Sequence, residues 1–300
     1  MMNIMKKNLL ETHDYYRERV NSQLEFFLSS ISSTRSSNSR LKDIMKYSAL
    51  SGGKRFRPIL TYTVANLFDV AIEKVDSCAC AIELIHIYSL IHDDLPVMDD
   101  DDIRHNQPTS HKVFGEAQAI LAGDGLQALA FQVICNDSFI DSAIKIKLLN
   151  LLSTSSYAMA EGQSIDLSIV SQKVDLELLN NMHKKKTGAL LSCAIKFGAL
   201  LNSTSDKDLS ILDSFSNNIG LAYQVQDDVL DVTTSGEVLG KRQNSDSIKN
   251  KPSYPAIIGV DESIKTFESL YQEAMDELSF LSVDAEPLRL ITEKLMTRSY

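Results

Sequence analysis

HIYSLIHDDLPVMDDDDIR, residues 86–104, places six aspartates within ten residues, directly after the apolar run of residues 81–91. That run has the hydrophobic period of a helix, so the first carboxylates should lie at the inner end of a buried helix. Packing like charges there without a counter-ion would be costly. Mg²⁺ would remove the cost, because it is bound by carboxylates together with substrate phosphates. The alternative is a solvated acidic loop, which most charge runs form.

A second acidic motif, Asp227, Asp228 and Asp231, lies in GLAYQVQDDVLDV after another apolar helical stretch. Asp227 and Asp231 are four residues apart, so they project from one face of a helix, with Asp228 beside them. The two motifs are far apart in the chain, so the fold must bring them together or leave two separate sites. Two facing carboxylate clusters in a helical bundle would form a clamp for several metal ions.

The periodicity of the sequence predicts an all-α protein. The 300 residues include only 6 prolines and 12 glycines, and no segment alternates convincingly with the period of a strand. We find no linker, composition break or repeat, so we expect residues 1–300 to form a single domain of about ten or more helices. The helices are expected near residues 11–33, 38–51, 55–68, 73–98, 110–134, 138–160, 175–201, 206–231, 254–280 and 285–298.

The composition limits the classes of partner and compartment. A net charge of −10 argues against nucleic acid or an anionic membrane as the main partner. The four cysteines lack disulfide-framework density and paired C-x-x-C spacing, so buried, reduced thiols are expected. The longest apolar stretch, residues 189–201, is too short to span a bilayer, and the N-terminal residues resemble neither a signal nor a transit peptide. We therefore expect a soluble, cytoplasmic protein.

A basic segment, GGKRFRP at residues 52–58, precedes a predicted helix. Its two glycines let the backbone approach an anion, and the amides of a helix N-terminus carry partial positive charge. Lys54, Arg55 and Arg57 add three cations. The segment is either a phosphate pocket or a basic helix cap.

These three motifs together resemble those of the trans-isoprenyl diphosphate synthases, and most of all those of the bacterial farnesyl diphosphate synthases. The motifs occur in the family's order, and the resemblance extends over nearly the whole chain. The resemblance implies the isoprenoid synthase fold, a helical bundle around a central active-site cavity. It implies a prenyltransferase that condenses isopentenyl diphosphate with dimethylallyl or geranyl diphosphate to give farnesyl diphosphate. It also implies a homodimer and about three Mg²⁺ ions, for which Mn²⁺ can substitute.

The resemblance assigns the metal ions to Asp93, Asp94, Asp99, Asp227 and Asp231, with Asp228 and Lys186 as further catalytic residues. The isopentenyl diphosphate is assigned to Gly53, Lys54, Arg57 and His86, although a lone histidine on an apolar helix is also typical of a core. Arg104 can bind a metal-bound diphosphate in a bidentate manner. His105 stands where the family usually has a second arginine, and a mostly neutral histidine forms no guanidinium fork. Weaker isopentenyl diphosphate binding is therefore expected.

The allylic diphosphate is assigned to a set of polar and basic residues in the second half of the chain, namely Gln163, Lys186, Thr187, Gln224, Lys241 and Lys251. Taken without the family, Gln163 could cap a helix, and the lysines at 184–186 could form a solvated face. Residues 232–255 are polar and rich in turn formers, which predicts a surface loop that orders when substrate binds.

Tyr88 and Ser89 lie about one turn before Asp93, where a bulky side chain would close the bottom of a pocket that opens at the aspartates. Core packing is the alternative. In the family, an aromatic residue here and two extra residues between Asp94 and Asp99 are typical of the bacterial farnesyl type. Geranyl and geranylgeranyl diphosphate remain alternative products, because they differ only in the pocket depth required.

Three other classes are less consistent with the sequence. A terpene cyclase needs no second diphosphate site, so the cations of residues 52–58 argue against it. A non-catalytic regulatory subunit of a prenyl synthase commonly loses one aspartate motif, and both are complete here. A calcium-binding module is disfavoured because residues 93–102 lack the glycine and terminal glutamate of an EF-hand loop.

Overall fold

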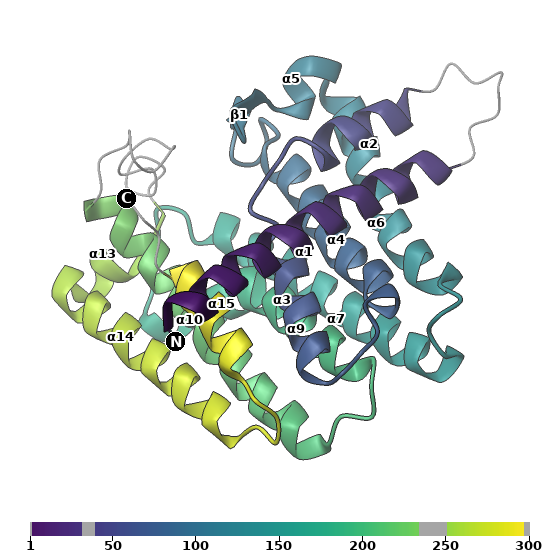
Figure 1. Ribbon diagram of the computed structural model, residues 1–300. Helices are drawn as coiled ribbons and strands as arrows, with labels where there is room; N and C mark the ends of the chain where they lie inside the picture. Colours follow the sequence, from purple (N-terminus) through teal and green to yellow (C-terminus); the bar gives the residue numbers. More distant parts are fainter. Residues whose placement is uncertain (1, 32–39, 234–250, 297–300) are drawn as a thin grey trace.

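The computed structural model describes residues 2–31, 40–233 and 251–296, which are almost entirely helical (Figure 1). The first part of the chain forms α1 (Met2–Ser30), α2 (Leu41–Ala49), α3 (Phe56–Leu67), η1 (Ile72–Lys74), α4 (Asp76–Asp93), α5 (Ser110–Phe114), α6 (Glu116–Asn136) and α7 (Ser142–Ser168). The second part forms α8 (Leu176–His183), η2 (Lys184–Gly188), α9 (Ala189–Leu200), α10 (Asp206–Thr233), α13 (Tyr254–Ile258), α14 (Val260–Glu277), η3 (Leu278–Phe280) and α15 (Glu286–Met296). The all-α prediction is confirmed.

Helix α4 is the central helix of the bundle. It packs against α3, α6 and α9, and α1 crosses the molecule in front of it in Figure 1. Because α4 is apolar on nearly every side, it is buried along most of its length, as expected for a helix without a polar face. Its C-terminal end therefore carries the first aspartate motif directly out of the core.

The helix ends earlier than the sequence analysis predicted, at Asp93 rather than near residue 98. Pro96 explains the difference, because a proline disfavours helical geometry in the preceding residue, here Leu95. The chain then folds back on the end of α4, with the Asp99 amide donating to the Asp93 carbonyl at 2.8 Å and the Asp101 amide to the Asp94 carbonyl at 3.2 Å. The later aspartates therefore lie in a compact loop rather than on the helix.

That loop leads into a two-stranded antiparallel hairpin, which the sequence analysis did not predict. Strand β1 (Ile103–Arg104) pairs with β2 (Gln107–Pro108). The two residues between them, His105 and Asn106, both have positive φ (50° and 61°), as a tight two-residue hairpin turn requires. These strands are too short for any period-2 hydrophobic pattern to reveal them.

Three predicted helices are interrupted in the structure. Gly115 and Gly259 have positive φ (87° and 84°) and separate α5 from α6 and α13 from α14. Residues 175–201 are divided by η2, a π-helical turn over Lys184–Gly188. Insertions of this kind are frequent at functional sites.

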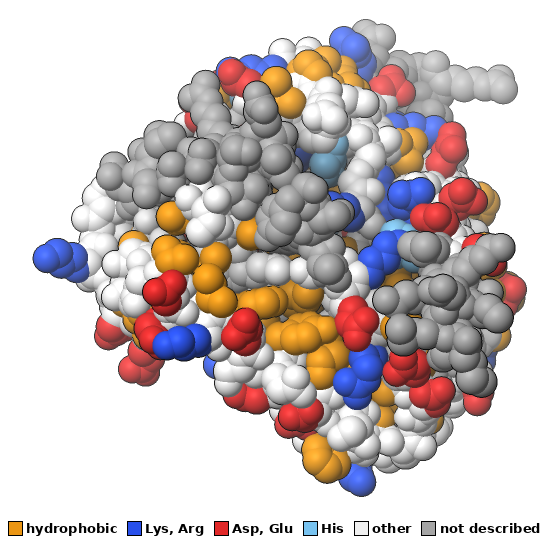
Figure 2. All heavy atoms as spheres, turned by 60° about the vertical axis from the view of Figure 1, so that its left-hand side comes forward, with side chains coloured by type: hydrophobic (Ala, Val, Ile, Leu, Met, Phe, Trp, Pro, Cys, Tyr) orange, Lys and Arg blue, Asp and Glu red, His pale blue; other side chains and the backbone are white. Residues whose placement is uncertain are grey.

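The expected burial of the cysteines is confirmed at Cys78, Cys80 and Cys193, which are buried free thiols, and wrong at Cys135, which is exposed. On the face shown in Figure 2, the coloured acidic and basic side chains are interspersed around a band of apolar ones. The negative net charge is therefore not gathered on this face.

Two helical segments, Ile72–Asp93 and Glu116–Asn136, are long and apolar enough to cross a membrane by length and composition. The sequence analysis weighed only residues 189–201 as a membrane span and did not consider either of these segments in that role. The first is 78% buried inside the fold, as the core helix of a globular protein would be, whereas the second is 44% buried.

Candidate active site

The first aspartate motif begins at the last residue of α4. Burial raises the pKa of Asp93 to about 6, Lys186 opposes this shift, and the neighbouring Asp99 adds to it. Asp94 is buried, its Oδ1 accepts a hydrogen bond from Nε of Arg104 at 2.7 Å, and Nη2 of Arg104 lies 2.6 Å from the same oxygen as an ion pair. Arg104 thus neutralises the carboxylate of Asp94. The negative charge of Asp93 is less well compensated.

Asp99 belongs to a network of charges drawn from distant parts of the chain. Lys251 Nζ lies 3.0 Å from Asp99 Oδ1 and 2.8 Å from Oδ2 of Asp166, near the end of α7. Lys186, in the π-helical turn, approaches the same Asp166 oxygen at 2.7 Å. Although burial alone would raise the pKa of Asp166, the two lysines hold it below its usual range. Two ammonium groups are thereby aimed at one point beside the first motif.

Gly162 allows this arrangement, because α7 and the π-helical turn meet there backbone to backbone. A Cβ atom at this position would lie 2.2 Å from the amide nitrogen of Lys186. Only glycine permits such an approach. The turn then presents Thr187, whose Oγ1 donates to Oε1 of Gln224 on α10 at 2.9 Å.

The second aspartate motif occupies the last turns of α10. Oδ2 of Asp228 accepts the backbone N–H of Tyr254 at 2.9 Å, and His183 Nε2 lies 3.6 Å from the same oxygen. Asp227 and Asp231 are half-buried beside it. No sequence motif had marked His183 or Tyr254, whose rings stack with centroids 6.0 Å apart.

A single short segment connects the two motifs. Lys251 contacts Asp99 of the first, and Tyr254, three residues later, contacts Asp228 of the second. Three residues span at most about 10 Å. The two acidic motifs therefore lie on either side of one small region, together with Lys186 and Asp166.

Gln163, one turn before Asp166 on α7, faces an unusual environment. The residue is buried, and neither atom of its side-chain amide has a hydrogen-bond partner among the described residues. Buried polar groups are normally paired. An amide in this state fits a polar ligand at the site. The alternative, that Gln163 caps the helix, does not agree with the structure, because α7 continues to Ser168.

The basic segment, residues 52–58, lies near the hairpin and near His86 in the C-terminal half of α4. Burial, followed by the charges of Arg57 and Arg104, holds the pKa of His86 well below its usual range. His105 packs onto Gly53, where a Cβ would meet the His105 ring at 3.2 Å. Partial burial, Arg104 and Arg55 lower the pKa of His105, which keeps this residue neutral and unlike the arginine of the family pattern.

The three cations of this segment have different environments. Lys54 is exposed and Arg57 is partly buried, with an Nε that lacks a hydrogen-bond partner among the described residues. Arg55 is 4% exposed, and its guanidinium donates to Oε1 of Glu83, Oδ1 of Asn21 and the carbonyl of Ala49 at 2.8, 2.8 and 2.6 Å. Arg55 is thus a structural residue and is not available to a phosphate.

Tyr88 and Ser89 lie below Asp93 on α4. Tyr88 is buried, and its ring meets His92 edge-on at 5.7 Å, whereas Ser89 donates back to the carbonyl of His86 at 2.8 Å. The bulk at this level of the helix therefore comes from Tyr88. Among the other predicted site residues, Lys241 lies outside the described part of the chain.

Comparison with known proteins identifies relatives of this chain in sequence and in overall fold. Residues 38–280 match the family described as polyprenyl synthetase. The chain is 42% identical over 272 residues to the farnesyl diphosphate synthase of Escherichia coli (strain K12), which covers 87% of this chain and 90% of that protein. It is also 42% identical over 261 residues to the geranylgeranyl diphosphate synthase of Cyanophora paradoxa, covering 86% and 87%. A crystal structure of a geranyltransferase from Legionella pneumophila superposes with a TM-score of 0.86 at 34% identity, covering 98% of both chains.

Proposed function

This chain belongs to the polyprenyl synthetase family, and on that premise we propose that it is a short-chain trans-prenyltransferase. It condenses isopentenyl diphosphate with dimethylallyl and then geranyl diphosphate to give farnesyl diphosphate. The observation that carries this proposal is the short segment of Lys251 and Tyr254, which contacts both acidic motifs and, through Asp166, lies beside the ammonium group of Lys186. A metal-bound diphosphate ester needs carboxylates to bind the metal ions and cationic groups to bind the phosphate oxygens, all in one place.

The donor set of the site fits Mg²⁺. The proposed ligands offer carboxylate oxygens, which hard cations prefer, and burial of Asp93 makes its charge costly without a cation. Asp228 is already engaged by the Tyr254 amide, so it positions the connecting segment beside the ligands Asp93, Asp94, Asp99, Asp227 and Asp231. When bound, about three such ions, or Mn²⁺ in their place, stabilise the charge of the departing pyrophosphate.

Two separate groups of residues hold the two substrates. We assign the isopentenyl diphosphate to Gly53, Lys54, Arg57, His86 and His105, of which Lys54 is exposed and able to reach a ligand. The allylic diphosphate is assigned to Arg104, Gln163, Lys186, Thr187, Gln224, Lys241 and Lys251. Once the allylic carbon–oxygen bond breaks, the double bond of isopentenyl diphosphate attacks that carbon, and a proton passes to the released pyrophosphate.

The test is incubation of the purified chain with Mg²⁺, dimethylallyl diphosphate and isopentenyl diphosphate, followed by chromatographic sizing of the products. We expect a fifteen-carbon product, and none when the metal is removed with EDTA. A twenty-carbon product would favour geranylgeranyl diphosphate synthesis. Consumption of farnesyl diphosphate without isopentenyl diphosphate would instead indicate a cyclase, and activity only with a partner chain would indicate a regulatory subunit.

Tyr88 is the residue that we propose to limit product length. Replacing it by alanine (Tyr88→Ala) removes a buried ring below Asp93, which deepens the space available to the growing hydrocarbon. We expect the product distribution to shift from fifteen to twenty or more carbons. The measurement is the chain-length profile of the products, with Tyr15→Ala on the exposed side of α1 as the matched control. An unchanged profile would show that Tyr88 only packs the core.

We also propose a single domain over residues 1–300 that acts in the cytoplasm as a homodimer. The main apolar core runs from Tyr16 on α1 to Met296 on α15, and Phe267 and Leu270 pack against both this core and a smaller cluster around Val225, which supports the single domain. The second subunit would pack on α6 and α7, because these helices expose apolar side chains, among them Leu121 on α6 and Ile146 on α7. An apolar surface of this kind marks an interaction site.

Leu121→Glu places a charge in the proposed dimer interface and should convert the dimer to a monomer. The mass in solution, measured by size-exclusion chromatography with light scattering, reports the change. Ile264→Glu, at an exposed position on α14, is the matched control and should leave the mass unaltered. If the Leu121→Glu protein keeps the mass of a dimer, the interface lies elsewhere.

A further inference from the structure

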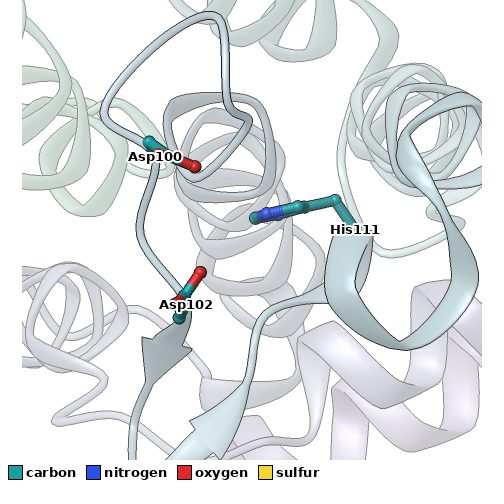
Figure 3. Close-up of side chains that lie close together, drawn as sticks. All are labelled: Asp100, Asp102 and His111. Carbon is teal, nitrogen blue, oxygen red and sulfur yellow. The ribbon is translucent and has the colours of Figure 1, made fainter.

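We propose a further metal site, formed by Asp100, Asp102 and His111, that takes a first-row divalent ion such as Zn²⁺. One carboxylate oxygen from each aspartate and one ring nitrogen of the histidine lie within 4.8 Å of one another. Figure 3 shows the nitrogen-bearing end of the His111 ring pointing between the two carboxylates. The proposal goes beyond the prenyltransferase reaction, because none of the three residues is among the proposed Mg²⁺ ligands Asp93, Asp94, Asp99, Asp227 and Asp231.

His111 gives evidence that is independent of the acidic cluster. It is 6% exposed, and its Nε2 has no hydrogen-bond partner among the described residues. Nδ1 lies 3.2 Å from Oγ1 of Thr109, and that hydroxyl donates its only proton to the carbonyl of Asp101 at 2.9 Å. The hydroxyl must then accept from Nδ1–H. With that proton on Nδ1, Nε2 carries the lone pair, and the nitrogen-bearing end of the ring points between the two aspartates.

A lone pair cannot donate a hydrogen bond to a carboxylate, whereas a bound cation would satisfy Nε2 and the two carboxylates together. Lys112 Nζ lies 2.7 Å from Oδ1 of Asp102 and offsets one negative charge. A carboxylate accepts several interactions, so this pair does not exhaust Asp102 as a ligand. The fixed tautomer of His111, oriented through Thr109, is the arrangement in which a neighbouring group prepares a histidine for a metal.

The loop itself separates this cluster from the proposed Mg²⁺ ligands. The carboxylate of Asp101 lies 3.3 Å from Nη2 of Arg104, and that of Asp99 contacts Lys251. Asp100 and Asp102 instead turn toward His111 on α5, and Asp100 adopts a positive φ of 52°. An ion held here would fasten to α5 the loop that carries Asp99 and leads into Arg104 of β1.

The donor types select the class of metal. Imidazole suits Zn²⁺ and similar transition metals, whereas Mg²⁺ prefers oxygen ligands alone. Ligand atoms that share one Zn²⁺ lie at most about 4.2 Å apart, since each bond is about 2.1 Å long. The present atoms lie within 4.8 Å of one another, so the side chains would move closer together when the ion binds. Water would complete the coordination of a site with three protein ligands.

The test is calorimetric titration of the full-length, metal-free protein with Zn²⁺, in the absence of any diphosphate. Asp93→Asn and Asp227→Asn are introduced first, so that the proposed Mg²⁺ sites do not contribute. We expect one equivalent of Zn²⁺ to bind, and His111→Gln to weaken its affinity by at least about ten-fold. Because no substrate is present, the outcome does not depend on whether the prenyltransferase proposal is correct.

Asp100→Asn is the second variant, and it guards against a folding defect in His111→Gln. Asparagine adopts the positive φ of this position readily, so the change removes a charged ligand without straining the exposed loop. It too should weaken Zn²⁺ binding about ten-fold or more, whereas His13→Gln on α1 should leave it unaltered. The proposal is overturned if the Asp93→Asn and Asp227→Asn protein binds no Zn²⁺, or if both site variants bind it as tightly as their parent.

Discussion

Asp227→Ala is expected to lower kcat by about 10³-fold, which is the largest effect on turnover that we predict. Asp227 lies half-buried on α10, and its neighbour Asp228 contacts the segment that reaches the first motif. Its loss would remove a ligand from the proposed clamp on the pyrophosphate. Negative charge develops on the pyrophosphate as the allylic bond breaks. Removing the Asp227 carboxylate should therefore lower kcat more than it changes KM. Steady-state kinetics at saturating Mg²⁺ measures both.

Two further variants show whether the effect belongs to the site. Asp206→Ala changes an exposed aspartate in the first turn of the same helix and should leave kcat within about two-fold, since exposed substitutions cost little. Asp228→Asn keeps an oxygen that can accept the Tyr254 amide, so it should be milder than Asp227→Ala. Near-normal turnover by a folded Asp227→Ala protein would remove this residue from the proposed mechanism.

Arg55→Met is expected to lower the free energy of unfolding by about 3–5 kcal/mol, which is the largest effect on stability that we predict. The side chains of Arg55 and Glu83 are 2% and 4% exposed and form an ion pair at 2.8 Å. Removing the guanidinium leaves Glu83 charged and buried without its partner. It also leaves the carbonyl of Ala49 and the amide of Asn21 without the donors that they now contact. Urea denaturation measures the change.

The adjacent Lys54 provides the contrast. Lys54→Met should alter the free energy of unfolding by no more than about 0.5 kcal/mol, because this side chain is exposed. It should instead raise the KM for isopentenyl diphosphate. The double variant Arg55→Met, Glu83→Met should recover most of the stability lost in Arg55→Met, because well-packed apolar residues replace buried ion pairs at little cost. Equal stability losses at Lys54 and Arg55 would contradict this division of roles.

Much of the fold and part of the site could be predicted from local sequence patterns. The helical period of residues 81–91 correctly indicated a buried helix that ends in carboxylates, because periodicity depends only on neighbouring residues. The proline after Leu95 could have corrected the end of α4. The burial of Arg55 could not have been foreseen, since its partner Glu83 lies on another helix and a basic tripeptide looks the same whether it faces solvent or the core. Asp166, His183 and Tyr254 were missed as site residues for the same reason: their importance comes from contacts between distant segments.

Asp166 pairs with both of the described lysines that we propose to bind the allylic diphosphate, Lys186 and Lys251. It holds Lys186 and Lys251 at 2.7 and 2.8 Å, so both ammonium groups are already desolvated and oriented before a diphosphate arrives. In the proposed reaction, an incoming diphosphate would therefore displace a protein carboxylate rather than attract freely hydrated lysines. This exchange would make diphosphate binding weaker than the number of positive charges suggests. The two lysines would pair with Asp166 again when pyrophosphate leaves.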